Sequence, residues 1–203
     1  MINILGKIPR DVTLACSGGQ DSMAVLDFLM NGKRNVTVAH FNHGTNHGRD
    51  ANKFISSLCA DRNIDLVSET LVGKKPAGDS WEDWWRNKRY EFFRRLNAPI
   101  ITAHHLNDVA EWWLFTSFRG SPRLMPHRNR NVIRPFLTTP SSELTSWCER
   151  KGVDHVIDPG NTNFKFSRSR IRHNILPEVL KVNPGFLTVL RKKIDKEFNK
   201  NNG

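Results

Sequence analysis

The chain has 203 residues, of which 38% are hydrophobic, and its 31 Lys and Arg outnumber 20 Asp and Glu, giving a formal net charge of +11. This content suffices for a folded core and argues against disorder, and no apolar run approaches the length of a membrane span. The positive excess favours a polyanionic partner, with nucleic acid as the first candidate. The scattered cysteines Cys16, Cys59 and Cys148 form neither a disulfide nor a metal-binding pattern, and the N-terminus does not resemble a signal peptide. We therefore expect a cytoplasmic protein without a membrane anchor.

Short apolar runs alternate with helical patterns over the first part of the chain. The expected strands cover residues 12–16, 36–41, 65–71 and 99–103, and the expected helices cover 23–30, 50–62, 80–96 and 107–118. Four such alternations with short connections predict a parallel β-sheet with helices on both faces, which is the α/β class.

The pattern changes after residue 118. Residues 119–135 contain five arginines and no acid, and Pro122 and Pro126 favour a loop. Beyond it we expect a helix over 141–151, a short strand over 155–157 and basic helices over 168–200. The predicted division is an α/β domain of residues 1–140, followed by residues 141–203, which complete that domain and add a basic helical extension.

The stretch Ser17-Gly-Gly-Gln-Asp-Ser22 stands between the first expected strand and the first expected helix. Two glycines let the backbone turn sharply, and the N–H groups at a helix start favour an anion such as phosphate. Asp21 would repel bare phosphate, so its presence indicates a divalent cation that neutralises a polyphosphate. A tight turn with Asp21 as a helix cap is the alternative, but the complete hexapeptide favours the phosphate site. The Gly-Lys-Ser/Thr of a Walker A loop is absent.

Other chemistry-bearing residues fall at the same predicted edge of the sheet. His104, His105 and Asp108 follow the fourth strand, and ligands of open α/β sheets bind at that edge. Asp108 could share the metal with Asp21 or orient an incoming amine. The face formed by residues 82, 86 and 89 of the third helix either lies in solvent or contributes to the site.

Basic residues crowd the last part of the sequence. Residues 164–200 contain ten Lys and Arg against three acids. A solvated charged face is the alternative, but together with the acid-free arginine loop these residues favour a track for the phosphodiester backbone.

The hexapeptide resembles the PP-loop of the ATP pyrophosphatases, the adenine nucleotide α-hydrolase-like superfamily, and further motifs resemble the tRNA(Ile)-lysidine synthetase family over roughly residues 12 to 185. In chain order these motifs are His40-Phe-Asn-His-Gly44, the helix over 80–93, Thr102-Ala-His-His-Leu-Asn-Asp-Val-Ala-Glu111, Arg119-Gly120, Arg134-Pro-Phe-Leu137, Asp158-Pro-Gly-Asn161, Arg168-Ser-Arg-Ile-Arg-His173 and Leu176-Pro177. The PP-loop is shared by many enzymes, whereas the late arginine-rich motif is much more specific.

The resemblance implies a Rossmann-like fold and a ligase that uses ATP and Mg²⁺ to join lysine to C2 of the wobble cytidine of tRNA(Ile) with a CAU anticodon. It implies the catalytic residues Asp21, Arg86, His104 and Asp108, with Asp21 and Asp108 also holding the metal. The implied ATP contacts are Ala15, Ser17, Gly18, Gly19, Gln20, Asp21, Ser22 and Arg119. The implied RNA contacts are Arg168, Arg170, Arg172 and His173.

This sequence departs from the family pattern at several positions. Asn107 replaces the family's first acid, Val109 its Gln, Trp112 its Thr, and Thr45-Asn46 its Leu-Arg. Either the acid is dispensable, or the amine differs, or activity is reduced. The alternatives are therefore a PP-loop enzyme with another nucleophile or base, and a non-catalytic nucleotide- or RNA-binding descendant. Family members usually carry further C-terminal domains, so the resemblance implies a minimal form whose tRNA selection rests on looser contacts, a partner or a homodimer.

Overall fold

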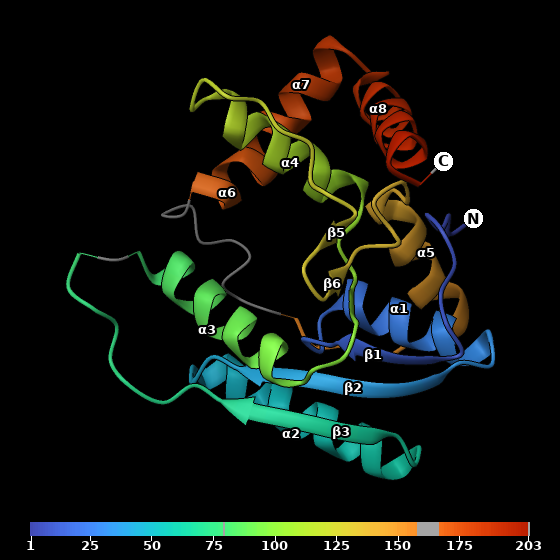
Figure 1. Ribbon diagram of the computed structural model, residues 1–203, viewed down its shortest axis with the longest axis vertical. Helices are drawn as coiled ribbons and strands as arrows, with labels where there is room; N and C mark the ends of the chain where they lie inside the picture. The colour runs from blue at the N-terminus through green and yellow to red at the C-terminus, as the bar shows by residue number, and fades with distance from the viewer. Residues whose placement is uncertain (79, 158–166, 203) are drawn as a thin grey trace.

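The computed structural model describes residues 1–78, 80–157 and 167–202, and it contains one six-stranded sheet in the order β3-β2-β1-β4-β6-β5 (Figure 1). The strands are β1 (Asp11–Ala15), β2 (Asn35–Asn42), β3 (Asp65–Thr70), β4 (Ile100–Thr102), β5 (Arg128–Asn129) and β6 (Val132–Ile133). Every neighbouring pair is parallel except β5 with β6, which is antiparallel. The predicted α/β class with a parallel sheet is confirmed.

Helices fill the connections between the strands and form the C-terminal part of the chain. They are α1 (Gln20–Asn31), α2 (Asn46–Asp61), α3 (Trp81–Arg95), α4 (Leu106–Ser117), α5 (Ser141–Lys151), α6 (Ser167–Arg170), the π-helical turn η2 (Ile171–Ile175), α7 (Leu176–Val182) and α8 (Phe186–Asn202). Ser80 caps α3 as predicted, because its Oγ accepts the backbone N–H of Asp83 at 3.1 Å.

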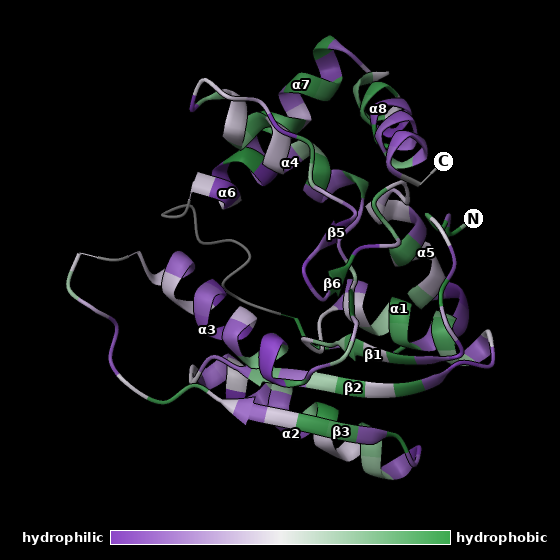
Figure 2. Ribbon diagram, in the orientation of Figure 1, coloured by the Kyte–Doolittle hydropathy of each residue, from purple (hydrophilic) through white to green (hydrophobic). Residues whose placement is uncertain are grey.

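Two apolar clusters cover the two faces of the sheet. On one face, Leu14 and Val38 of the sheet pack with residues from α1, α2 and α5, among them Leu26, Ile55 and Leu144. On the other face, the aromatic residues of α3 pack against Phe41 and Val132. Most of α3 is nevertheless hydrophilic (Figure 2), and its fully buried residues are Trp84, Phe92 and Phe93. This leaves most of the α3 surface for polar contacts.

A third cluster joins α4 to the C-terminal helices. Val109 and Leu114 of α4 pack with Leu176, Leu190 and Ile194. Figure 1 shows α4, α7 and α8 gathered at the end of the molecule away from β3. The predicted helical extension therefore shares a core with a helix of the α/β part. The division at residue 140 stays a prediction.

Two local predictions differ from the structure. Residues 155–157 are described and form no strand, because Val156 contributes a single backbone hydrogen bond, to the carbonyl of Gly18, instead of a ladder. The expected loop over 119–135 contains the β5–β6 hairpin, whose strands are too short to give an apolar run. Across the described ranges, no helix has the combination of length and apolarity that crossing a membrane requires.

Candidate active site

The loop between β1 and α1 is held in shape by its own residues. Ser22 Oγ donates to the carbonyl oxygen of Gly19 at 2.9 Å and accepts the backbone N–H of Ser17 at 3.2 Å. Gly18 has φ +82°, which glycine adopts without strain. A Cβ at Gly18 would lie 3.1 Å from Cγ2 of Val156, whose N–H donates to the Gly18 carbonyl at 2.9 Å. The turn is therefore preformed, and a side chain at residue 18 would be strained by both the backbone conformation and the contact with Val156.

Helix α1 starts at this loop with unused N–H groups. Its N-cap is Gly19, and no side chain within the described residues caps it. The N–H of Met23 donates to the carbonyl of Gly19, so the N–H groups of residues 20–22 precede the first helical hydrogen bond. These groups and the helix dipole favour an anion. The interpretation of Asp21 as the helix cap is wrong, because Asp21 lies within the first turn.

His105 connects the two acids that the sequence places at the site. Its Nε2 lies 3.4 Å from Oδ2 of Asp21, and its Nδ1 lies 3.5 Å from Oδ2 of Asp108. His105 and Asp108 also form a reciprocal cap of α4, because each backbone N–H donates to the other's side chain, at 3.0 and 3.3 Å. Since β1 and β4 are adjacent parallel strands, the residues that follow them meet at one sheet edge.

Burial and neighbouring charges set the protonation of this cluster. Burial lowers the pKa of His105, but Asp108 and Asp21 outweigh that effect and raise the pKa. Burial raises the pKa of Asp108, but His105, His104 and Arg172 outweigh it and lower the pKa. Burial lowers the pKa of His104 to about 3, and its Nδ1 shares a hydrogen bond of 2.7 Å with Thr102 Oγ1. His105 is therefore the imidazole that can carry a proton, whereas His104 is held neutral.

Two arginines of the C-terminal extension reach the same cluster. Arg172 Nη2 lies 3.0 Å from Oδ1 of Asp108 and 2.9 Å from Oε2 of Glu111. Arg168 Nε lies 3.2 Å from the other carboxylate oxygen of Glu111, which is only 4% exposed. Both arginines thus pair with carboxylates of α4 in this structure. Their predicted RNA contacts stay predictions, as do those of the exposed Arg170 and His173.

Trp112 lies between arginines from two helices. The guanidinium carbons of Arg86 and Arg168 lie 5.7 and 5.6 Å from its ring centroid, and Arg168 Nη1 lies 3.7 Å from Oε1 of Glu82. The α3 face that carries residues 82 and 86 therefore turns toward α4 and α6 and forms a salt bridge there, and its contribution to the site stays a prediction. Arg86 and Arg168 both contact the ring of Trp112, and Arg168 also pairs with Glu111.

Asp21 is the carboxylate best placed to meet a cation. Its side chain is 42% exposed, whereas that of Asp108 is 16% exposed and is paired with Arg172. Within the described residues, no three His, Cys, Asp or Glu side chains converge to hold a metal ion. Mg²⁺ usually takes one or two carboxylates together with substrate phosphates and water, so this sparse donor set fits it.

The structure does not bring every predicted residue to the loop. Arg119 lies beyond the far end of α4, whose 12 residues span about 18 Å, and its guanidinium carbon lies 4.3 Å from the ring centroid of Phe115. Its ATP contact stays a prediction without support from this geometry. Ala15 ends β1 immediately before the loop. The motif at 158–161 lies outside the described residues.

Asn107 has a structural contact. Its Oδ1 accepts the backbone N–H of Ser141 at 3.0 Å, at the first residue of α5. The N-cap of α5 is Pro140, which offers no side-chain acceptor. An amide oxygen serves this purpose as a carboxylate would, so the contact favours the interpretation that the acid at this position is dispensable.

Sequence reasoning missed the role of Glu111 and gave His105 no role separate from that of His104. The spacing held a usable signal, because Asp108 and Glu111 are i and i+3 on one helix and His105 and Asp108 have the spacing of a capping box. The arginine partners of Glu111 lie too far along the chain for any local pattern to indicate them.

Comparisons with known proteins agree with the geometry of the loop. The PP-loop domain family matches residues 3–179. The tRNA(Ile)-lysidine synthase of Francisella philomiragia is 29% identical over 203 residues, covering 92% of this chain and 50% of that protein. That of Thermotoga maritima is 33% identical over 190 residues, covering 85% and 46%. The bifunctional protein TilS/HprT of Listeria innocua is 31% identical, covering 84% and 30%. The chain thus spans about half the length of the lysidine synthases, or less. With a preformed loop before the uncapped start of α1 and a family match over residues 3–179, the chain belongs to the PP-loop domain family.

Proposed function

We propose that this protein is an ATP-dependent ligase that joins lysine to C2 of the wobble cytidine of tRNA(Ile) with a CAU anticodon. The names of the relatives support this substrate pair. The observation that carries the proposal is the meeting of Asp21, His105 and Asp108 beside the uncapped start of α1. A phosphate site and a proton-carrying cluster are the two parts that this reaction needs. The site of action would be the cytoplasm.

ATP would bind with its phosphates at the loop over residues 17–22. The N–H groups at the start of α1 and the hydroxyl of Ser17 are the donors available there. Asp21, and with it Asp108, would hold Mg²⁺, which supplies charge neutralisation to the polyphosphate when bound. Arg86 is a cation with no carboxylate partner within the described residues, so it is available to a phosphate group.

The reaction has two steps. The O2 atom of cytidine attacks the α-phosphorus, the bond from that phosphorus to the bridging oxygen breaks, and pyrophosphate leaves. The neutral ε-amine of lysine then attacks C2, the C2–O bond breaks, AMP leaves, and the amine gives up a proton. Asp108 positions the lysine amine. Most of the rate gain that such a carboxylate can provide comes from holding the amine beside C2. His105, which touches Asp108, is the nearest group able to exchange a proton.

One assay tests this function against the alternatives. The protein is incubated with MgATP, labelled lysine and tRNA(Ile) with a CAU anticodon, and both label in RNA and pyrophosphate are measured. Labelled RNA supports the proposal. Pyrophosphate without label indicates another nucleophile, and neither product with RNA binding intact indicates a non-catalytic binder.

Asp21→Ala sharpens this test. We expect loss of pyrophosphate release with RNA binding unchanged, because Asp21 is the more open carboxylate at the phosphate loop. Asp50→Ala is the matched control, since Asp50 is exposed on α2. If Asp21→Ala keeps the activity of the Asp50 control, the assignment of the metal to Asp21 is wrong.

A further inference from the structure

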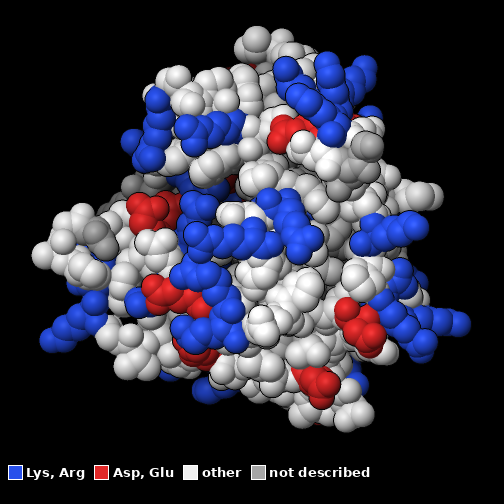
Figure 3. Space-filling model, in the orientation of Figure 1, with Lys and Arg blue, Asp and Glu red and all other residues white. Residues whose placement is uncertain are grey.

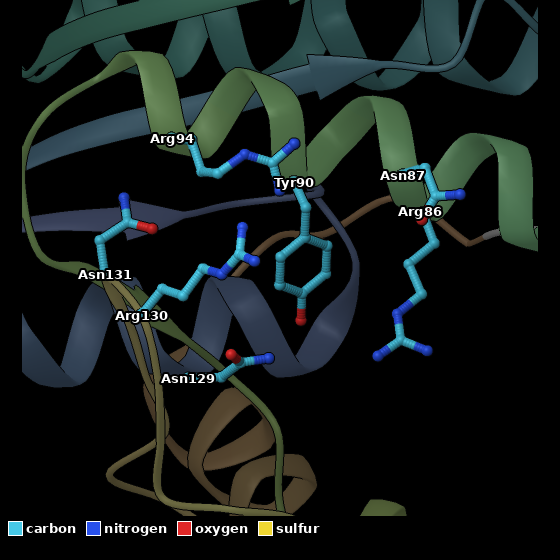
Figure 4. Close-up of a pocket in the computed structure, with 7 residues that line it drawn as sticks. All are labelled: Arg86, Asn87, Tyr90, Arg94, Asn129, Arg130 and Asn131. Carbon is cyan, nitrogen blue, oxygen red and sulfur yellow. The ribbon is translucent and has the colours of Figure 1, made fainter.

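A basic groove runs between α3 and the β5–β6 hairpin. It consists of two adjoining cavities of about 250 Å³ and 460 Å³, which share Arg94, Arg130 and Asn131. Arg86 and Tyr90 border the first cavity, and Arg128 borders the second. In Figure 4, Tyr90 points from α3 into the space beside the hairpin, and Arg130 points from the hairpin toward Arg94 and Tyr90, whereas Arg86 lies farther along α3. We call this surface the hairpin groove.

The hairpin groove carries positive charge without compensation. Among the described residues, four arginines and no Asp or Glu line it. Within the described residues, none of these four arginines forms an ion pair with a carboxylate. Figure 3 shows Lys and Arg gathered over the middle of this face of the molecule. Concentrated unpaired cations in a hollow attract a polyanion.

The hairpin is built rigidly around a strained arginine. Arg130 has φ +56°, a conformation that disfavours side chains other than those of Gly, Asn and Asp. Asn131 fixes the hairpin to the end of α3, because its Nδ2 donates to the carbonyls of Phe93 at 2.7 Å and Ala98 at 3.1 Å. Arg128 Nε donates to the Arg130 carbonyl at 3.1 Å. Glycine or asparagine would adopt this backbone conformation with less strain, so the presence of an arginine suggests that its charge has a functional role.

Arg86 connects the hairpin groove to the active-site cluster by side-chain contacts. This residue lines the groove and also lies over the ring of Trp112, which Arg168 contacts as well. Arg168 in turn pairs with Glu111, so the groove borders residues that contact the cluster.

We propose that the hairpin groove binds the phosphodiester backbone of the RNA substrate and guides it toward the active site, an inference that rests on the proposed function for the choice of RNA. The distribution of four arginines over two adjoining cavities suits a chain of phosphates better than one small anion. Amide side chains at residues 87, 97 and 129 add donors for phosphate and sugar oxygens. The mostly apolar lining of a small-molecule pocket is absent from the first cavity.

The test compares two triple variants of the full chain. The first, Arg94→Gln, Arg128→Gln and Arg130→Asn, removes three charges from the hairpin groove and leaves Arg86 in place. The matched control, Arg10→Gln, Lys53→Gln and Arg62→Gln, removes three exposed charges elsewhere. Binding of a fluorescein-labelled anticodon stem–loop RNA with a CAU anticodon is followed by anisotropy between about 50 and 200 mM salt.

Each lost phosphate contact reduces the magnitude of the slope of log K against log salt by about 0.7 for single-stranded RNA. The loss of three contacts in the groove variant should therefore reduce the magnitude of the slope by about 2. Over this fourfold salt range, the wild-type affinity should then fall about 16-fold more than that of the groove variant. The control should keep the wild-type slope. Equal slopes in the two variants would show an effect of net charge and overturn the proposal.

Two further measurements keep the result unambiguous. If the triple variant is unfolded by circular dichroism, Arg94→Gln alone should lower the slope by about 0.7, and an unchanged slope overturns the proposal. If polyglutamate binding falls as much as RNA binding, the surface fits an acidic polypeptide and the choice of RNA is wrong. Groove-dependent RNA binding by a chain that transfers no lysine would refute the proposed function and support the groove.

Discussion

Asn107 offers the most direct test of whether this departure from the family pattern affects chemistry or structure. Its Oδ1 accepts the N–H of Ser141 at 3.0 Å and thereby caps α5 in place of Pro140. Asn107→Ala removes this acceptor and should lower the free energy of unfolding by about 1 kcal/mol. In a protein of this size, that loss lowers the melting temperature by about 2–4 °C. Asn107→Asp keeps the acceptor and places a negative charge at the start of α5, which should add about 0.3–1 kcal/mol.

The assay pairs thermal unfolding with pyrophosphate release measured well below the melting temperature. We expect Asn107→Ala to be less stable and Asn107→Asp to be at least as stable as the wild type, with pyrophosphate release unchanged in both. The reasoning is refuted if Asn107→Asp raises pyrophosphate release or lysine transfer tenfold or more. It is equally refuted if Asn107→Ala removes activity while the melting temperature stays the same.

Two further predictions concern the phosphate loop and the charges beside it. Gly18→Ala places a Cβ 3.1 Å from Val156 Cγ2 and 3.4 Å from Ile55 Cδ1 at φ +82°, so the free energy of unfolding should fall by more than the backbone strain of about 1–2 kcal/mol, and ATP binding should weaken. Gly73→Ala is the control, because Gly73 has φ +111° and nothing lies within 4 Å of its added Cβ. Equal urea midpoints of the two variants would contradict the contact argument. Asp108→Asn should reduce the pH dependence contributed by His105, whose pKa both Asp108 and Asp21 raise. A raised histidine pKa stabilises the fold below the unfolded value of about 6.5 and loses this effect as pH rises through the folded value. The stability difference between wild type and Asp108→Asn should therefore be larger at pH 6 than at pH 9, and a constant difference would count against the His105–Asp108 interaction.

Local signals in the sequence were enough to predict several elements of the fold. Apolar runs identified β1, β2 and β4 because a buried parallel strand needs continuous apolar residues. Ser80 marked the start of α3 because a hydroxyl there satisfies a free N–H group. The two-glycine turn before α1 indicated an anion site for the same kind of reason, since the backbone geometry depends on the residues in the turn itself.

Tertiary structure alone decided which charged groups meet. Nothing local to Glu111 indicates that Arg168 and Arg172 pair with it, because the contact depends on the packing of α7 and α8 against α4. The choice of His105 over His104 likewise depends on which ring lies between Asp21 and Asp108 and which is buried as a neutral group. The β5–β6 hairpin was missed because two-residue strands carry no periodicity, and its side-chain anchor lies at the end of α3. Local propensity acts over a few residues, whereas ion pairs and packed cores depend on distances that only the folded chain sets.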